Sequence, residues 1–315
     1  MEHAALGRSG LTTSRLGLGL AALGRPGYIN LGHGEDLVDR SVGAMEAHAH
    51  RMLDAAYRMG ITYVDAARSY GRAEEFLATW LEATKPDITV GSKWGYTYTA
   101  GWRVDAEQHE VKDHGVAAFE RQIVESQHVL GDALRLYQIH SATPETGVLE
   151  DAAVLSRLSR LREDGIAVGL STSGPHQSTV IRQAIAVVVD GVPLFDAVQA
   201  TWNLLETSAA PALREAADAG MGVIVKEAVA NGRLTARNEH VSGLLPGAVA
   251  PDSLAIAAAL MQPWCHVVLS GAATIDQLHS NATALAIEQE WVADLPDLAE
   301  PPGEYWARRR ALPWT

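Results

Sequence analysis

Residues 45–71, MEAHAHRMLDAAYRMGITYVDAARSYG, contain one complete helix–strand unit of this chain. Residues 45–59 form an amphipathic stretch that stops before Gly60, a residue type that commonly ends helices. A short apolar run follows at 62–64, and the sequence turns polar at Asp65. Because this run is apolar without alternation, it is typical of a parallel strand buried on both faces. The stretch therefore predicts one unit of a parallel α/β fold.

The same succession occurs about eight times along the chain. Strand-like runs lie at 16–19, 62–64, 88–90, 136–139, 166–170, 197–200, 222–225 and 267–269. Helix-like segments lie at 45–59, 73–82, 116–130, 149–163, 177–189, 209–219, 253–261 and 275–287. This alternation predicts an α/β fold, a single closed (β/α)8 TIM barrel. An open doubly wound sheet would require a glycine-rich phosphate turn after the first strand, where the chain offers only Gly17-Leu18-Gly19.

We expect one domain spanning residues 1–315, with three segments outside the alternation. They are an N-terminal leader that forms a hairpin on the barrel floor, a loop at about 94–114, and a tail from about 291. The loop and the tail hold five of the eight tryptophans. Aromatic side chains at one barrel mouth favour a substrate wall, for which we select Trp94, Trp102 and Trp306. The alternative is that these rings only anchor long loops.

The composition limits the classes of partner and the location. The formal net charge of −13 disfavours nucleic acid and anionic membranes as main partners. No segment reaches the roughly 18 apolar residues of a membrane span, and the N-terminus lacks the apolar stretch of a signal peptide. The single cysteine, Cys265, cannot form an intrachain disulfide, so we expect a cytoplasmic protein. The sequence does not distinguish a monomer from a homo-oligomer.

Polar side chains follow six successive predicted strands. In barrels of this class the carboxyl ends of all strands meet at one mouth, so these side chains are expected to converge there. They are Asp65, Lys93, His140, Ser171, Gln199 and Lys226, in chain order. Tyr70 lies five residues after Asp65, close enough to reach the same mouth.

These residue types suit proton transfer at a carbonyl or alcohol. A phenol has a pKa near 10, and the ammonium group of Lys93 is expected to lower that of Tyr70. Asp65 can neutralise Lys93 in a buried position, and His140 can donate to a substrate oxygen. His109, Asp113 and His114 match no common metal site, so we expect no metal.

Four segments resemble the signatures of the aldo-keto reductase superfamily, in order and in spacing. They are Val64-Asp65 with Tyr70-Gly71, Ser92-Lys93-Trp94, Gln138-Ile139-His140-Ser141, and Gln199-Ala-Thr-Trp-Asn203. The resemblance covers almost the whole chain. It implies a catalytic tetrad of Asp65, Tyr70, Lys93 and His140, with Tyr70 as general acid/base and His140 positioning the carbonyl. The implied activity is hydride transfer between a nicotinamide cofactor and an aldehyde or ketone, or the corresponding alcohol, including sugar-like alcohols.

The resemblance also implies the cofactor site. Ser171 and Gln199 match residues that hold the nicotinamide amide, whereas Thr172 replaces the usual Asn and Lys226 replaces the aromatic residue that usually stacks on the ring. The pyrophosphate and adenosine would lie against Asn231, Gly232, Arg233, Gly271, Ala272, Gln277 and Asn281. The family favours NADP(H), which we expect in preference to NAD(H). The absence of Lys or Arg between Arg237 and Arg308 keeps NAD(H) as the alternative.

Two other functions are compatible with the same residues. Lys93 at a strand end could form a Schiff base in an aldolase-type lyase. The barrel could also be a non-enzymatic regulatory subunit that binds the nicotinamide cofactor, a role that the family includes. The spacing of Asp65 and Tyr70 argues against the lyase.

Overall fold

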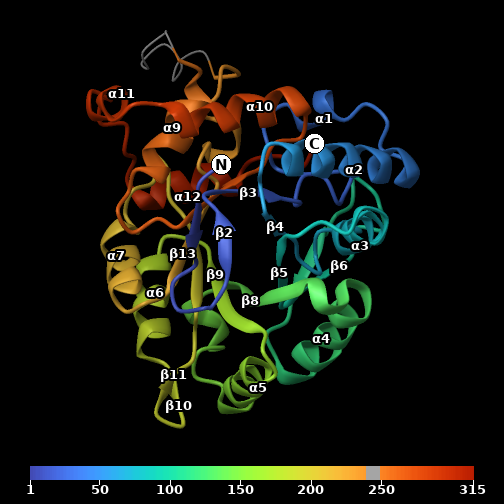
Figure 1. Cartoon of the computed structure of the whole chain (residues 1–315), viewed down its shortest axis with the longest axis vertical. Helices are drawn as coiled ribbons and strands as arrows, with labels where there is room; N and C mark the ends of the chain where they lie inside the picture. The colour runs from blue at the N-terminus through green and yellow to red at the C-terminus, as the bar shows by residue number, and fades with distance from the viewer. Residues whose placement is uncertain (239–248) are drawn as a thin grey trace.

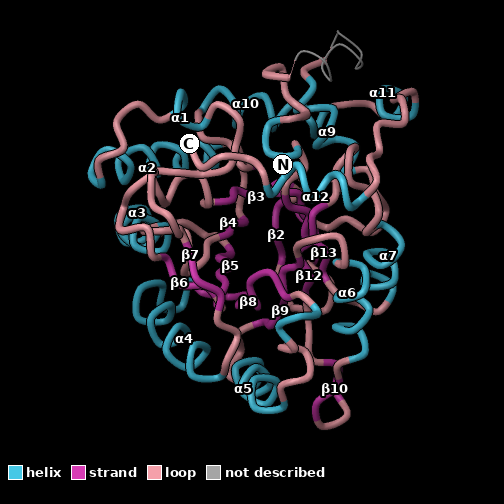
Figure 2. The backbone as a smooth tube through the Cα atoms, turned by 180° about the vertical axis from the view of Figure 1, so that it is seen from behind, coloured by secondary structure: helices cyan, strands magenta, loops and turns pink. Residues whose placement is uncertain are grey.

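The computed structural model describes residues 1–238 and 249–315 of the chain. Eight parallel strands form a closed barrel in the order β12-β13-β14-β3-β4-β5-β8-β9. Helices surround this barrel on all sides (Figures 1 and 2). The strands are β3 Leu16–Gly19, β4 Tyr63–Asp65, β5 Thr89–Trp94, β8 Leu134–Ala142, β9 Ala167–Thr172, β12 Ala197–Thr201, β13 Gly222–Lys226 and β14 Val267–Ser270. The predicted (β/α)8 barrel is confirmed.

Each of the eight barrel strands is followed along the chain by an outer helix. The outer helices are α2 Val42–Arg58, α3 Ala73–Thr84, α4 Val116–Leu130, α5 Ala152–Glu163, α6 Gln177–Ala186, α7 Ala210–Asp218, α9 Pro251–Leu260 and α10 Ile275–Thr283. Gly60, predicted to end the first helix, has the left-handed φ of 84° that this role requires. No helix within 1–238 and 249–315 is both long enough and apolar enough to span a bilayer.

Two predicted helices end early in the structure. The helix predicted at 177–189 ends at Ala186, so the prediction is wrong for its last three residues. Val188–Val189 (β10) pairs instead with Val192–Pro193 (β11) in a small hairpin outside the barrel. Asp190 and Gly191 supply the positive φ angles, 50° and 79°, that a tight hairpin turn needs. The prediction at 275–287 covers α10 and then a separate 3-10 turn, Ala284–Ala286.

An N-terminal hairpin closes the barrel floor, as predicted. It pairs β1, His3–Ala5, with β2, Thr12–Ser14. Leu6 and Leu11 from this hairpin are buried among inward-facing residues of the strands, namely Tyr63, Leu136, Ala167, Ala197, Ile224, Val267 and Leu269. Gly7 has a φ of 53° and lies so close to the chain that an added Cβ would be 2.2 Å from the Gly222 nitrogen. The N-terminal hairpin therefore fills this end of the barrel interior.

The barrel strands extend further toward that mouth than their apolar runs predict. β4 includes Asp65, β5 includes Lys93, and β8 includes His140. Lys93 lies opposite Gln138 in the parallel ladder, and Lys226 lies opposite Thr201. The ladder hydrogen bonds join backbone groups, so a strand continues through polar residues whenever its neighbour continues. The strand backbone therefore sets the positions of the Cα atoms from which these polar side chains extend.

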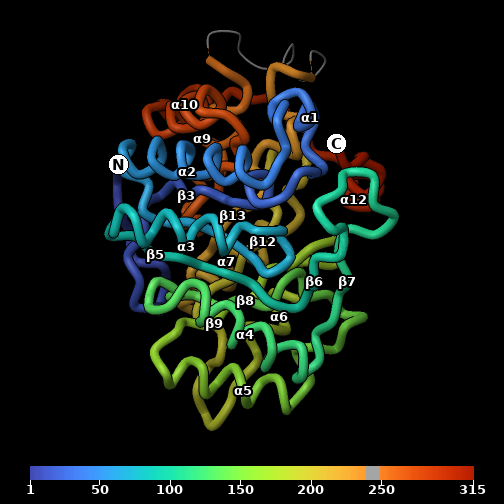
Figure 3. Tube along the Cα trace, turned by 90° about the vertical axis from the view of Figure 1, so that its right-hand side faces the viewer, coloured from blue at the N-terminus to red at the C-terminus, as the bar shows by residue number. Residues whose placement is uncertain are grey.

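Three short segments lie around the mouth. The loop at 94–114 contains a hairpin of β6, Tyr96–Tyr98, with β7, Glu110–Lys112, and the tail contains α12, Pro302–Arg310. The third is the short helix α1, His33–Asp36, and a further short helix, α11, spans Gln289–Ala293. Figure 3 shows α1, the β6–β7 hairpin and α12 along the same edge of the molecule. The backbone of Tyr28 pairs with that of Thr315, which joins the loop after β3 to the tail.

Candidate active site

A cavity of about 330 Å³ opens at the carboxyl ends of the barrel strands. Its walls come from strand ends, from the loop after β3, from the β6–β7 hairpin and from the tail. The lining residues at strand ends include Asp65, His140, Gln199, Lys226, Ser270 and Gly271. Those from loops and tail include Tyr70, Arg25, Tyr28, Asn30, Tyr96, Glu110, Asn231, Arg309, Arg310 and Trp314. The cavity thus collects charged and aromatic side chains from distant parts of the chain.

Lys93 lies beneath this cavity with its side chain fully buried. Its Nζ donates to the carboxylate of Asp65, to the Ala66 carbonyl at 2.8 Å and to the Tyr70 hydroxyl at 3.2 Å. Burial lowers the pKa of Lys93, while the Asp65 carboxylate opposes that shift. All three N–H bonds of the ammonium group are directed at partners, so Lys93 holds Asp65 and Tyr70 in a fixed geometry.

The Asp65 carboxylate is held from several strands besides β5. Its Oδ1 accepts from Gln199 Nε2 at 2.9 Å, from Gln138 Nε2 at 3.4 Å and from the Tyr63 hydroxyl at 3.4 Å. Gln138 and Tyr63 were not predicted as site residues. Gln199 was predicted to hold the nicotinamide amide, and in the structure its amide nitrogen supports Asp65 while the residue still lines the cavity.

Tyr70 is buried, and its environment keeps the phenol protonated. Burial raises the pKa of Tyr70 well above 10, the Asp65 carboxylate raises it further, and Arg25 lowers it. The expectation that Lys93 lowers this pKa overall is wrong, because burial and the Asp65 carboxylate beside the ammonium outweigh its effect. The Arg25 guanidinium lies 5.2 Å from the centre of the Tyr70 ring. At neutral pH the free protein therefore presents a phenolic proton to the cavity.

His140 faces Tyr70 across the same cavity. The two rings meet edge to face with centroids 5.4 Å apart, and Tyr96 packs on His140 from another side at 4.9 Å. Burial lowers the pKa of His140 well below 6.5, and the charges of Lys93 and Arg25 lower it further. The imidazole is therefore neutral at pH 7 and carries one N–H that can donate to a substrate oxygen.

The loop histidines contact other residues of the mouth. His114 Nε2 is hydrogen-bonded to the backbone carbonyl of His140 at 2.9 Å. His109 stacks on Trp314 with ring centroids 4.0 Å apart. Across 1–238 and 249–315, His, Cys, Asp and Glu side chains nowhere gather in a group of three suited to a metal ion.

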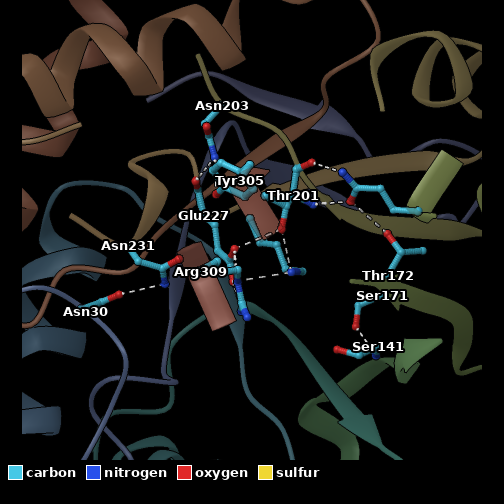
Figure 4. Close-up of polar contacts among 12 residues, drawn as sticks. Asn30, Ser141, Ser171, Thr172, Thr201, Asn203, Glu227, Asn231, Tyr305 and Arg309 are labelled. Atoms are coloured by element: carbon cyan, nitrogen blue, oxygen red, sulfur yellow. Dashed lines mark hydrogen bonds and ion pairs between the residues drawn. The ribbon is translucent and has the colours of Figure 1, made fainter. Parts of the chain in front are cut away.

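The end of β13 carries a charged cluster that joins the barrel to the tail (Figure 4). Lys226 Nζ donates to Thr201 Oγ1 at 2.8 Å and lies 3.7 Å from the Glu227 carboxylate. Glu227 accepts from Arg309 Nε at 2.8 and 3.0 Å and again from the Arg309 terminal nitrogen. Asn203 joins the Glu227 carbonyl to the Tyr305 hydroxyl through bonds of 2.9 and 3.0 Å. This cluster positions α12 over the mouth.

Sequence reasoning missed this cluster. The run Arg308–Arg310 reads as a solvated tail, yet Arg309 is partnered with Glu227, which lies 82 residues earlier. The available signal is weak: two adjacent charges, Lys226 and Glu227, directly after a buried strand need partners.

We expect Glu227 to stabilise the fold at neutral pH and less so in acid. Burial raises the pKa of Glu227, but Arg309 and Lys226 lower it more, to about 2. In the unfolded chain this pKa is near 4.3, so the ionised carboxylate contributes about 3 kcal/mol above that pH and loses it as the pH falls toward 2. Urea unfolding of the parent and Glu227→Gln checks this: their difference in unfolding free energy should be about twice as large at pH 7 as at pH 3. An equal difference at both pH values would contradict it.

The other predicted cofactor residues lie in two groups. Ser171 and Thr172 are fully buried and do not line the cavity themselves. Ser171 Oγ accepts from the Ser141 backbone at 2.8 Å, and Thr172 contacts Gln177 at 3.5 Å. Gly271 lines the cavity with open space beside it, and Ala272 donates its N–H to Ser270 at 3.3 Å. Asn231 also lines the cavity, and its amide nitrogen donates to Asn30 at 3.2 Å (Figure 4).

The second group lies outside the cavity lining. Arg233 pairs with Glu300 beside Gly232, and Asn281 is hydrogen-bonded to the Ser270 hydroxyl at 2.8 Å. Gln277 accepts from the Ala273 backbone and donates to Asp36 at 2.9 Å. Arg237 pairs with the same Asp36 carboxylate. The loop after β3 therefore meets α10 where the adenosine end of a dinucleotide is expected.

None of the three tryptophans selected for the substrate wall lines the cavity. Trp94 is fully buried against Phe119 and His114. Trp102 donates to the Arg40 carbonyl at 2.7 Å, and Trp306, on the buried face of α12, packs beside Tyr305. The loops turn these rings back onto the protein, which corresponds to the anchoring alternative. The aromatic wall instead consists of Tyr28, Tyr96 and Trp314.

The free polar groups around the cavity suit a nucleotide. Asn231 Oδ1 is buried and accepts no hydrogen bond from the described residues. Gly271 leaves its backbone accessible. At the N-terminus of α10, the Thr274 side chain accepts only from the Gln277 N–H, so the N–H groups before Gln277 in the first turn can bind an anion. These groups fit the phosphates of a dinucleotide whose ring reaches Tyr70.

Comparisons with known proteins agree with this geometry. A sequence model of the Aldo/keto reductase family matches residues 15–245. The uncharacterized oxidoreductase YqkF of Bacillus subtilis (strain 168) is 24% identical over 307 residues, which cover 90% of this chain and 91% of that protein. Pyridoxal 4-dehydrogenase of Microbacterium luteolum is 28% identical over 214 residues, 58% of each chain. The holo form of the aldo-keto reductase AKR11C1 from Bacillus halodurans superposes with a TM-score of 0.75 at 22% identity, covering 96% of this chain and 97% of that one.

Proposed function

Because this chain belongs to the aldo/keto reductase family, we propose that it is a nicotinamide-dependent oxidoreductase in which Tyr70 is the general acid/base. Its substrate would be an aldehyde or ketone, or in the reverse direction the corresponding alcohol, including a sugar-like one. One observation carries the proposal. The Tyr70 hydroxyl, in contact with the buried Lys93 ammonium, shares a cavity with the neutral imidazole of His140.

The chain's own residues would position the reactants and move one proton. The chemistry that a bound nicotinamide cofactor would supply is transfer of a hydride, with its two electrons, to the carbonyl carbon. His140 donates a hydrogen bond to the carbonyl oxygen and orients it toward Tyr70. Tyr70 transfers its phenolic proton to that oxygen as negative charge develops there, and the Lys93 ammonium, which Asp65 holds in place, stabilises the resulting phenolate. In alcohol oxidation the phenolate accepts the proton instead.

Residues at the mouth would hold the cofactor. Ser171, Thr172 and Gln199 lie at the strand ends where the nicotinamide amide would bind. Asn231, Gly232 and Arg233 would cover the pyrophosphate, and Gly271 and Ala272 would receive it at the start of α10. Gln277 and Asn281 would lie on the adenine side.

We propose that NADP(H) is preferred over NAD(H). The supporting residue is Arg237, whose guanidinium pairs with Asp36 beside Gln277, so a cation is present at the adenosine end although α10 itself has none there. A 2′-phosphate could compete with Asp36 for this guanidinium. Asp36 alone would instead favour the unmodified ribose of NAD(H).

Direct binding of both dinucleotides tests the cofactor assignment. We expect NADPH and NADH each to quench tryptophan fluorescence saturably, with the lower Kd for NADPH in the micromolar range. Absence of binding by both would contradict the proposed function. Arg237→Met should raise the Kd for NADPH about tenfold and leave that for NADH nearly unchanged. Equal changes for both cofactors would assign Arg237 a structural role.

The geometry disfavours a Schiff-base lyase. Lys93 Nζ is fully buried, does not line the cavity, and donates to three acceptors in the described part of the chain. A Schiff base requires a neutral amine that reaches the substrate carbon. The intact arrangement of Tyr70, Lys93 and His140 also favours turnover over a purely regulatory role.

A further inference from the structure

We propose that Lys226 makes this site bind the reduced nicotinamide dinucleotide more tightly than the oxidised one. The inference rests on the proposed function, because it requires a nicotinamide ring in the cavity. Its physical basis is that the oxidised ring carries a positive charge and the reduced ring does not. An ammonium group in the same small, partly desolvated cavity repels only the oxidised form.

The placement of Lys226 follows from the barrel. It is the last residue of β13, opposite Thr201 on β12, and its Nζ donates to Thr201 Oγ1 at 2.8 Å. Its side chain lines the cavity together with Tyr70 and His140. The charge of Lys226 also acts on His140, whose ring contacts Tyr70, so a ring placed beside Tyr70 and His140 for hydride transfer would lie within range of the Lys226 ammonium.

The surrounding charges leave Lys226 largely uncompensated. Glu227 is its nearest carboxylate, at 3.7 Å, but Glu227 is committed to Arg309 from α12 through three hydrogen bonds. Asp65, which lines the cavity, is paired with Lys93 beneath it, and Arg25 is paired with Glu110. Arg310 lines the cavity from the tail, and His140 is neutral. Each pair sums to zero, so Lys226 contributes the net positive charge on the β13 side.

The expected effect is a difference in affinity of about tenfold. Two unit charges several ångströms apart in a protein environment interact strongly enough to change a Kd by about 10- to 100-fold. Partial compensation by Glu227 favours the lower figure. A single neutral substitution at Lys226 should therefore be measurable by equilibrium binding alone.

The same residue makes the effect depend on pH. Burial lowers the pKa of Lys226, Glu227 raises it, and Arg309 and Lys93 lower it, with a result of about 8. Below pH 8 the ammonium is present and the oxidised ring is penalised. Above pH 8 the amine is neutral, so the ratio of Kd for NADP+ to Kd for NADPH should fall as the pH rises from 7 to 9.

Isothermal titration with NADP+ and with NADPH tests the proposal without any turnover. For the parent, we expect the Kd ratio to be about fivefold larger at pH 7 than at pH 9, because a pKa of about 8 spreads a tenfold effect beyond this pH range. Lys226→Met should have the lower ratio at both pH values, and Lys226→Arg should keep the higher ratio at both, because its guanidinium does not titrate in this range. Arg103→Met, which removes an exposed charge outside the cavity, should behave as the parent.

The possible outcomes are distinguishable. Binding of both forms with the same ratio in the parent and in Lys226→Met overturns this inference and leaves the proposed function intact. No binding of either form by the parent overturns both. Should Lys226→Met fail to fold by circular dichroism, a parent ratio that is flat between pH 7 and 9 overturns the inference by itself.

Discussion

Tyr70→Phe should bind NADPH as the parent does and reduce carbonyl substrates at least about a hundredfold more slowly. The substitution removes only the hydroxyl group, so the ring still packs edge-on against His140 and under Arg25. The proton donor is lost, and His140 cannot replace it readily, since burial and nearby cations hold its pKa well below 6.5. The loss should therefore appear in kcat, with little change in cofactor affinity.

The measurement is NADPH oxidation followed by absorbance across a panel of aldehydes and ketones. Tyr28→Phe is the matched control, because Tyr28 also lines the cavity but its hydroxyl has no part in the proposed proton transfer. A Tyr70→Phe enzyme that keeps more than about a tenth of the parent activity would contradict the assigned role.

Lys93→Met should reduce both stability and activity strongly. Removing a buried ammonium leaves the Asp65 carboxylate uncompensated, which costs about 3–5 kcal/mol of unfolding free energy. The remaining donors to Asp65, from Gln199, Gln138 and Tyr63, are neutral and only partly offset this loss. Turnover should fall as well, because the Tyr70 phenolate that forms during reduction loses the adjacent positive charge.

A double variant separates these two effects. Asp65→Asn combined with Lys93→Met removes both charges, so the unfolding free energy should recover most of the loss while kcat stays low. Urea unfolding and steady-state kinetics on the same samples provide both values. If the urea concentration at the unfolding midpoint is the same for Lys93→Met and for the parent, the ion pair does not stabilise the protein. The electrostatic account of the site is then wrong.

The sequence by itself determined the barrel and the residues that meet at its mouth. The apolar runs, the glycine after the first helix and the order of the elements are local properties of the chain, and each limits the backbone directly. A closed parallel barrel then brings all strand ends to one side, whatever the details of packing. For this reason Asp65, Lys93 and His140 could be placed together from their positions alone, and the structure does place them together. Their catalytic roles remain proposals.

Only the tertiary structure decided what surrounds these residues. The pairing of Glu227 with Arg309 depends on the path of the tail. The side chains of Gln138 and Tyr63 support Asp65 only because the closed barrel brings their strands together. Loop and tail paths also decide which aromatic side chains line the cavity, namely Tyr28, Tyr96 and Trp314. A loop path is set by many weak contacts, with no period in the sequence to reveal it. The sign of the Tyr70 pKa shift depended on burial and on Asp65 together, and burial exists only once the tail and loops have closed over the mouth.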